Sequence, residues 1–288
     1  MSCLFFLNVF LKIANLYQKI VKNYLTFLPH SPATKLGLNL FQKISTDVMK
    51  LINEPDIKKV SNFYIKNHDD IQDTQGIYKI IFLLQCIKET EHLEGDIIEL
   101  GSYKGGNAIM IAKFLKQIGS KKKVYACDTF SGIPEEDSNV KDIAEKYIIE
   151  YFSDTNLDAV KKKLKKYDVF NVKLVIGDFR NTLPNLDKEK FSLVFIDCNI
   201  FSSAKLAINF SYPRLVKDGV LFSHCYGAPK GKGSTSLWGE TYAVKEYLSN
   251  KLEKIVIESI PFMQKGHNPP KIINKMPKSE FGTYHKPD

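Results

Sequence analysis

Arginine is almost missing from this sequence. Arg180 and Arg214 are the only two among 288 residues, although the formal net charge is +9, so lysine carries nearly all of the positive charge. Base readout and bidentate phosphate binding favour the planar guanidinium fork of arginine over the ammonium of lysine. We therefore expect no specific nucleic-acid partner. The lysine-rich stretches at 121–123 and 161–166 are interpreted as a loop and a solvated helix face.

Cysteine is scarce and unpatterned. The five residues are odd in number, widely spaced and form no Cys-x-x-Cys pair. This distribution argues against a disulfide framework and is typical of a reducing compartment. A cytoplasmic location is therefore predicted.

The sequence also lacks an apolar run long enough to cross a bilayer, and it shows neither the charge order nor the cleavage site of a secretory signal peptide. Residues 1–28 are mostly apolar, but polar residues recur along them at steps of three and four, forming one narrow stripe on a helix. They are Asn8, Lys12, Asn15, Lys19 and Lys22.

Two interpretations of this amphipathic helix, which we assign to residues 1–32, stay open. It lies in the plane of an anionic membrane surface, as at the inner membrane face. Alternatively, it docks on the rest of the chain or on another subunit of a homo-oligomer. No internal repeat or low-complexity tract accompanies it.

Short apolar runs alternate with helical patterns from residue 96 onward. Strands are predicted at 96–100, 123–127, 172–176, 192–196 and 219–222, and helices at 106–118, 140–152, 157–167, 203–210 and 241–252. Such alternation predicts an α/β fold with a mostly parallel, doubly wound sheet. Residues 33–95 form a helical region preceding it, interpreted as a cap over the active site, and residues 266–288 a loop-rich tail. The central domain is expected to span residues 96–265.

The stretch from Asp96 to Gly106 carries the strongest signal of function. An apolar run ends at Glu99 and Leu100, passes through glycines and opens onto a helical pattern. Glycines at such a turn let the backbone approach a small ligand at a helix N-terminus. The spacing Glu-x-Gly-x-x-x-Gly-Gly differs from the dinucleotide motif Gly-x-Gly-x-x-Gly. It resembles the first strand and turn of class I S-adenosylmethionine (SAM) methyltransferases.

Acidic residues stand at the ends of successive predicted strands. Glu99 lies at the end of the first, Asp128 directly after the second, Asp178 after the third and Asp197 after the fourth. In an open α/β sheet the ligand binds at the carboxyl ends of the strands, where the strand order reverses. A carboxylate after the second strand can accept hydrogen bonds from both ribose hydroxyls of a nucleoside, and Asp178 is expected near the adenine amino group.

With these residues in view, the sequence resembles the macrocin O-methyltransferases, SAM-dependent enzymes that methylate sugar hydroxyls. The resemblance covers about residues 75–250. Its segments are Ile98-Glu-Leu-Gly-Ser-Tyr-Lys-Gly-Gly106, Cys127-Asp-Thr-Phe-Ser-Gly-Ile-Pro-Glu135, Gly177-Asp-Phe-Arg-Asn-Thr-Leu-Pro184, Ile196-Asp-Cys-Asn-Ile-Phe-Ser-Ser203, Tyr212-Pro-Arg-Leu-Val-Lys-Asp-Gly-Val220 and Ala243-Val-Lys-Glu-Tyr247. It implies a Rossmann-like fold with SAM held by Glu99, Gly101, Ser102, Gly105, Gly106, Asp128, Thr129, Asp178 and Phe179.

The sequence departs from this family where members hold a divalent metal. Their carboxylates after the fourth and fifth strands are replaced by Asn199, His224 and Cys225, and only Asp197 remains. Since Mg²⁺ prefers oxygen ligands, a family-type metal site at Asp197, Asn199, His224 and Cys225 is in doubt. His224 has three open interpretations: a general base, a ligand with Asp197, Cys198 and Cys225 of a softer ion such as zinc, or a structural histidine.

We predict a SAM-dependent O-methyltransferase that acts on a sugar or glycoconjugate, with Asp197 and His224 as its catalytic residues. Two alternatives remain open. One is a SAM-binding protein that has lost catalysis and serves as a scaffold or partner; the other is a metal-independent methyltransferase with a non-sugar acceptor such as a phenol.

Overall fold

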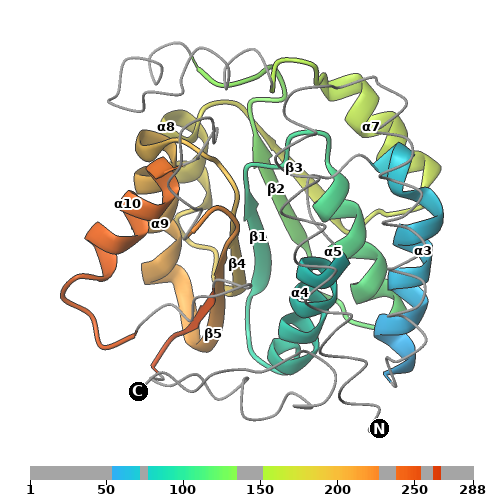
Figure 1. Cartoon of the computed structure of the whole chain (residues 1–288), viewed down its shortest axis with the longest axis horizontal. Coiled ribbons are helices and arrows are strands. Elements are labelled where there is room, and N and C mark those ends of the chain that lie inside the picture. Colours follow the sequence, from blue (N-terminus) through green and yellow to red (C-terminus); the bar gives the residue numbers. More distant parts are fainter. Residues whose placement is uncertain (1–53, 72–76, 135–151, 227–237, 254–261, 267–288) are drawn as a thin grey trace, which may run out of the picture.

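The computed structural model describes residues 54–71, 77–134, 152–226, 238–253 and 262–266 (Figure 1). The predicted amphipathic helix at 1–32, the tail beyond residue 266 and all but the last residue of the helix predicted at 140–152 fall outside these ranges. In the described part of the chain, no helix has the length and apolarity needed to cross a membrane.

The centre of the fold is a six-stranded sheet with the order β3-β2-β1-β4-β5-β6. The five parallel strands are β1 (Asp96–Leu100), β2 (Val124–Asp128), β3 (Val172–Ile176), β4 (Phe191–Ile196) and β5 (Leu215–Ser223). The short β6 (Phe262–Gln264) pairs antiparallel with β5. The predicted mostly parallel α/β sheet is confirmed. Strand order reverses between β1 and β4, the place where such sheets bind ligands.

Helices cover both faces of this sheet, as Figure 1 shows. One face carries α3 (Pro55–Ile71), α4 (Ile77–Thr90), α5 (Gly106–Gln117) and α7 (Leu157–Lys166), and the other carries α9 (Phe201–Arg214) and α10 (Trp238–Leu248). The short α8 (Phe179–Thr182) and a 3₁₀ turn at Leu183–Leu186 follow β3.

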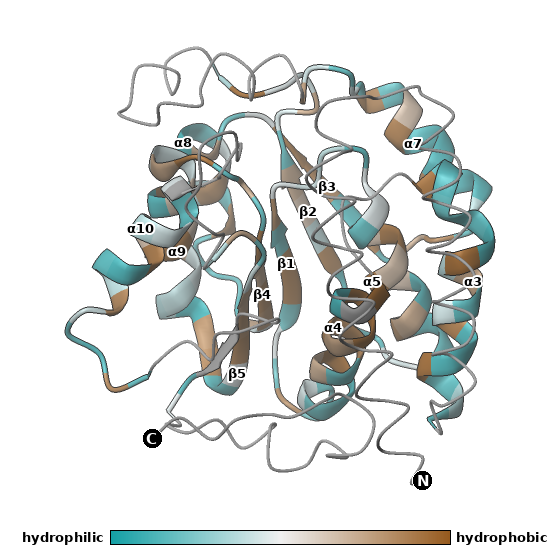
Figure 2. Cartoon of the chain, in the orientation of Figure 1, coloured by the Kyte–Doolittle hydropathy of each residue, from teal (hydrophilic) through white to brown (hydrophobic). Residues whose placement is uncertain are grey.

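Alternation along the strands divides the apolar residues between two cores. Ile97 of β1 packs in the core beneath α3, α4 and α5, whereas its neighbour Ile98 packs in the core beneath α9 and α10. Figure 2 shows the apolar strands between helices whose outer faces are polar. Because both sheet faces are covered, the strands are mostly continuous apolar runs rather than alternations of polar and apolar residues. Such runs can be recognised in the sequence.

The helices before residue 96 share a core with the sheet. Tyr64 of α3 and Phe82 of α4 are fully buried in the same cluster as Phe195 and Phe222 of the strands. Part of the region from 33 to 95 therefore covers a sheet face. The boundaries at residues 32, 95 and 265 and the cap over the active site stay predictions.

Several elements differ from the predicted boundaries. α9 spans Phe201–Arg214 rather than 203–210, and α10 ends at Leu248 rather than 252. β5 begins at Leu215 rather than 219, since the strand continues through an irregular register past Asp218, which has a positive φ of 67° and looks like a turn in sequence. α10 begins at Trp238 rather than 241, which brings Glu240 into its first turn. The three-residue β6 is too short to stand out as a periodic pattern.

Candidate active site

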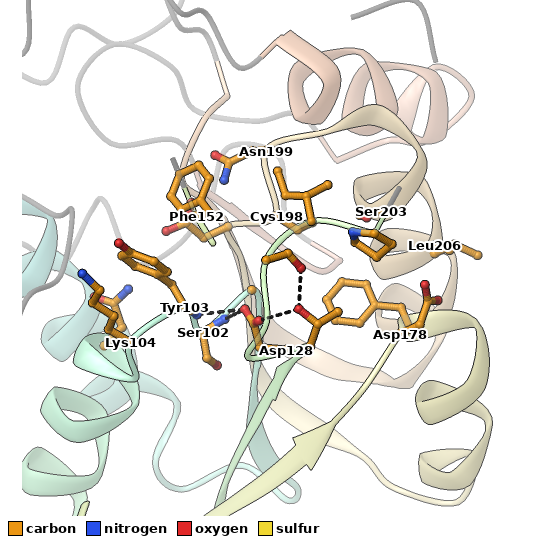
Figure 3. Close-up of a pocket in the computed structure, with 18 of the residues that line it drawn as sticks. Ser102, Tyr103, Lys104, Asp128, Phe152, Asp178, Cys198, Asn199, Ser203 and Leu206 are labelled. Atoms are coloured by element: carbon orange, nitrogen blue, oxygen red, sulfur yellow. Dashed lines mark hydrogen bonds between the residues drawn. The ribbon is translucent and has the colours of Figure 1, made fainter. Parts of the chain in front are cut away.

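A cleft opens at the carboxyl ends of β1, β2 and β4, next to the reversal of strand order. Its empty volume, open solvent included, is about 860 Å³. Figure 3 shows side chains converging on it from several loops. Of the predicted site residues, those that line it are Gly101, Ser102, Gly106, Asp128, Thr129, Asp178, Phe179, Asp197 and Asn199.

The glycine turn after β1 is required by close packing. Gly101 has φ +99°, and a Cβ there would stand 2.1 Å from the carbonyl oxygen of Asp197. Gly105, at φ 75°, precedes α5 and provides no side-chain cap for it. The first N–H groups of α5 are thus left for an anion such as the carboxylate of SAM. Asn107 lines the cleft, and its buried Oδ1 has no hydrogen-bond partner among the described residues, which suits a ligand donor.

Asp128 fastens the glycine turn to the end of β2. Its Oδ2 accepts the N–H groups of Ser102 at 2.9 Å and Tyr103 at 2.8 Å, and its Oδ1 accepts the N–H of Phe130 at 2.7 Å. Burial raises the pKa of this carboxyl, and the backbone donors act in the opposite direction. Oδ1 also accepts the hydroxyl of Thr129, at a longer 3.3 Å, so each oxygen already has two donors. A ribose hydroxyl therefore has less room at this carboxylate than the sequence predicted for both hydroxyls, and Oδ1, with its longer contact, offers most of it.

Glu99 lies beneath the cleft rather than in its wall. The side chain is fully buried, and its Oε2 accepts the hydroxyl of Ser102 at 2.6 Å. Burial raises its pKa to about 8, so the carboxyl holds a proton at neutral pH. Its hydrogen bond supports Ser102, which does line the cleft, and its contact with the cofactor stays a prediction.

The third strand leads into the part of the cleft where adenine is expected. Asp178 caps α8 and receives both the backbone and the guanidinium N–H groups of Arg180, and this pairing lowers its pKa. The carboxylate is thus already engaged rather than open to adenine. Phe179 lines the cleft beside it and offers an aromatic face. Sequence analysis overlooked this role of Arg180, although the motif contains the residue.

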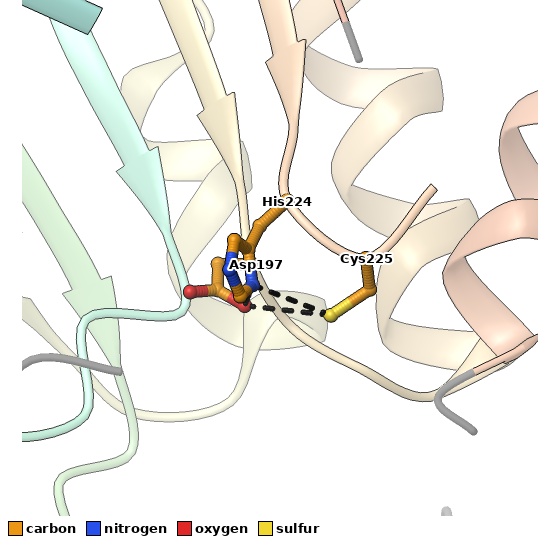
Figure 4. A group of neighbouring side chains, drawn as sticks. All are labelled: Asp197, His224 and Cys225. Carbon is orange, nitrogen blue, oxygen red and sulfur yellow. Dashed lines mark hydrogen bonds and ion pairs between the residues drawn. The ribbon is translucent and has the colours of Figure 1, made fainter. Parts of the chain in front are cut away.

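A cluster of three side chains stands where β4 and β5 end (Figure 4). His224 Nδ1 lies 2.9 Å from Asp197 Oδ1, and Cys225 Sγ lies 3.4 Å from that nitrogen and 3.8 Å from that oxygen. Asn199 Oδ1 lies 3.2 Å from the same sulfur. The structure therefore brings together all four predicted metal-site residues. Only Asp197 and Asn199 reach the cleft wall, with Cys198 beside them.

This donor set does not suit Mg²⁺. One carboxylate, one amide, one imidazole and one thiol are available, whereas Mg²⁺ is held by oxygen ligands. The nitrogen, sulfur and oxygen atoms lie within 4.8 Å of one another, so a softer ion remains the alternative to a metal-free pair. Cys198 is half-buried beside this region, and desolvation raises the pKa of its thiol, so it is a poor thiolate donor.

Sequence analysis missed one carboxyl near this cluster. Glu240, in the first turn of α10, is fully buried, and its Oε1 accepts the N–H of Cys225 at 3.1 Å. Its only signal in the sequence was an acidic residue close to a helix start, which ordinarily means a solvated cap.

Comparison with known proteins identifies this arrangement. Residues 76–260 match the family described as macrocin O-methyltransferase (TylF), which is more than half of the chain. The chain belongs to the macrocin O-methyltransferase family. It is therefore a SAM-dependent O-methyltransferase, and the resemblance stated from its motifs is confirmed.

One curated relative comes from Streptomyces olivaceus. It is an 8-demethyl-8-(2,3-dimethoxy-α-L-rhamnosyl)-tetracenomycin-C 4′-O-methyltransferase, 23% identical over 183 residues that cover 60% of this chain and 70% of the relative. Two solved structures share the fold of this macrocin-family chain. The O-methyltransferase NovP has a TM-score of 0.60 at 18% identity, covering 77% of this chain and 100% of its own. The calicheamicin methyltransferase CalS11 has a TM-score of 0.56 at 15% identity, covering 83% and 95%.

Proposed function

We propose that this macrocin-family enzyme methylates a hydroxyl of a sugar or glycoconjugate without Mg²⁺. The observation that carries the proposal is the pair of Asp197 and His224, joined at 2.9 Å where the cleft meets the ends of β4 and β5. The choice of acceptor rests on the Streptomyces relative, whose name places its methylation on a rhamnosyl-bearing compound.

The cofactor is assigned to the half of the cleft formed by β1, β2 and β3. The N-terminus of α5 and Asn107 would receive the carboxylate and ammonium of SAM, Asp128 Oδ1 its ribose, and Phe179 its adenine. Support comes from the uncapped helix, the unpartnered Asn107 Oδ1 and the aromatic face at the cleft wall.

The reaction asks for little beyond positioning and removal of one proton. Bound SAM would supply an activated methyl group on its sulfonium for transfer to the acceptor oxygen. Cleft residues align the two reactants, a contribution that makes the step effectively unimolecular. The acceptor proton leaves to the Asp197–His224 pair, in which the carboxylate orients the imidazole.

Other activities are distinguished by which acceptor turns over. A protein that has lost catalysis would bind SAM and transfer no methyl group, with or without metal. A metal-independent enzyme with a phenolic acceptor would methylate phenols and leave glycosides untouched. The missing carboxylates at 199, 224 and 225 motivate both alternatives.

Calorimetric titration with SAM and S-adenosylhomocysteine, run with Mg²⁺, Zn²⁺ or EDTA, tests the cofactor and the metal together. The expected result is micromolar binding that EDTA does not change, followed by methyl transfer to rhamnosides in EDTA. Activity that appears only with Zn²⁺ would assign the cluster to a soft ion instead. Failure to bind under every condition would overturn the proposal.

Residues 1–28 and the cellular location stay predictions. Flotation with anionic liposomes, comparing the full chain with a version that starts near Ala33, separates a membrane contact from a protein contact. Loss of flotation on truncation would support an in-plane helix, and a change of oligomeric state would support a docking helix.

A further inference from the structure

Glu240 is a buried carboxyl that the proposed chemistry does not use. Its side chain is fully buried, Oε1 accepts the hydroxyl of Ser223 and the N–H of Cys225, and Oε2 has no partner within the described ranges. Burying a carboxyl group costs free energy unless the group is hydrogen-bonded. Ser223 and Cys225 are the residues on either side of His224. Both hydrogen bonds therefore hold in place the segment that carries the imidazole.

The same segment is held along its backbone. The N–H of His224 extends the ladder to Ile196 at 2.9 Å, and the hydroxyl of Thr241 donates to the carbonyl of Cys225 at 3.2 Å. From α4, the ammonium of Lys79 donates to the carbonyl of His224 at 3.1 Å. Because α4 and α10 cover opposite faces of the sheet (Figure 1), the end of β5 is held by hydrogen bonds from both faces.

These hydrogen bonds begin where the regular pairing of β4 and β5 stops. β5 ends at Ser223, whose partner in the ladder is Ile196 at the end of β4. The next residue along β4 is Asp197, and the next along β5 is His224, so the pair meets one residue past the sheet. Side chains must hold the backbone there, and Glu240 supplies the bonds on the α10 side. It also ties α10 to the other strand end, since its own N–H donates to the carbonyl of Asn199 at 3.3 Å.

We propose that Glu240 is a positioning residue, which holds His224 against Asp197 by fixing the end of β5 to α10. Lys79 does the same from α4. Glu240 acts through the backbone and touches neither cofactor nor acceptor. The inference rests on the proposed function, because it takes the Asp197–His224 pair as the proton acceptor.

Glu240→Gln and Glu240→Leu test the role with matched shapes. The amide of Gln keeps an acceptor oxygen for Ser223 and Cys225, so kcat should stay within about 3-fold of wild type. Leu removes the acceptor, and kcat should fall about 100-fold, the cost of a small misplacement of a reacting group, while KM for SAM is unchanged. Glu246→Leu, on the exposed face of the same helix where Glu246 pairs with Lys205, is the control and should leave kcat unchanged.

NMR of the His224 imidazole provides a readout that is independent of turnover. The Nδ1 proton shared with Asp197 should give a low-field signal in wild type and Glu240→Gln, and lose it in Glu240→Leu. If wild type shows this signal but methylates nothing, the proposed function fails while the positioning role survives.

Three results would overturn the positioning role. They are an unchanged signal and kcat in Glu240→Leu, an equal loss in Glu240→Gln, or a rise in KM for SAM without a change in kcat. Should Glu240→Leu fail to fold, Lys79→Met provides the test, because it removes only the hydrogen bond from α4 to the carbonyl of His224. We expect kcat to fall about 10-fold and the imidazole signal to broaden. No change in either quantity would overturn the role.

Discussion

The two halves of the cleft are built by different means. In the cofactor half, at the ends of β1 and β2, Asp128 binds mainly backbone N–H groups, those of Ser102, Tyr103 and Phe130. In the acceptor half, at the ends of β4 and β5, His224 meets Asp197 side chain to side chain. Backbone N–H groups are available whatever the side chain. The geometry of the cofactor half therefore requires only a few particular residues, namely some glycines and one acid.

The acceptor half depends on several side chains fitting one another. Asp197, His224 and Cys225 contact each other there, and Glu240 comes from a helix further along the chain. Such a site can change its donors while the sheet and the cofactor half stay the same.

The largest effect is expected at Gly101, which contacts Asp197 where the two halves of the cleft meet. Gly101→Ala would drive a Cβ into the carbonyl oxygen of Asp197, 2.1 Å away, at φ +99°. We expect SAM binding to be lost and the free energy of unfolding to fall by about 3 kcal/mol or more. Thermal denaturation and calorimetry measure both. Gly119→Ala, at φ +71° with no atom within 4 Å, is the control and should cost about 1 kcal/mol without affecting SAM.

A substitution in the acceptor half should separate chemistry from binding. His224→Asn keeps a donor toward Asp197 but removes the imidazole, so kcat should fall about 10²- to 10⁴-fold. Affinity for SAM should stay within about 2-fold of wild type, since His224 is not in the cleft wall. Steady-state kinetics and calorimetry distinguish the two quantities. Unchanged kcat would assign His224 to structure alone.

A substitution in the cofactor half should give the reverse. Phe179→Ala removes the aromatic face at the expected adenine position and should weaken SAM binding about 10-fold, the usual value of one stacking contact. The kcat at saturating SAM should change little. Calorimetric Kd values check the first expectation. A fall in kcat with unchanged Kd would place the cofactor elsewhere.

The last prediction concerns Glu99 and the pH dependence of stability. Burial raises the pKa of this carboxyl from 4.5 to about 8, so between those values the folded chain holds a proton that the unfolded chain releases. Its contribution to stability is present below pH 4.5 and is lost as pH rises through about 8. Glu99→Gln should therefore flatten the decline of the unfolding free energy between pH 5 and pH 8.5, measured in urea. An equal decline in both proteins would contradict this.

The strands and the glycine turn of the cofactor half were predicted from the sequence, because their signals are local, whereas the SAM contacts of this half stay a prediction. The glycines at 101, 105 and 106 and the acids at strand ends can be recognised without knowing the fold. The sequence does not show that Glu99 accepts the hydroxyl of Ser102 or that Asp178 pairs with Arg180, since a strand-end carboxylate looks the same whether it faces a ligand, a hydroxyl or a guanidinium.

Sequence therefore determined the order of strands and helices, the glycine turn and the family, because apolar periodicity and short motifs are properties of neighbouring residues. Tertiary structure decided that His224 meets Asp197, that Glu99 turns inward and that Glu240 grips the end of β5. Asp197 and His224 meet because β4 and β5 pair side by side, and Glu240 reaches Cys225 because α10 packs on the sheet. Glu99 and Ser102 are close in the chain, but the orientation of the Glu99 side chain depends on its burial in the fold.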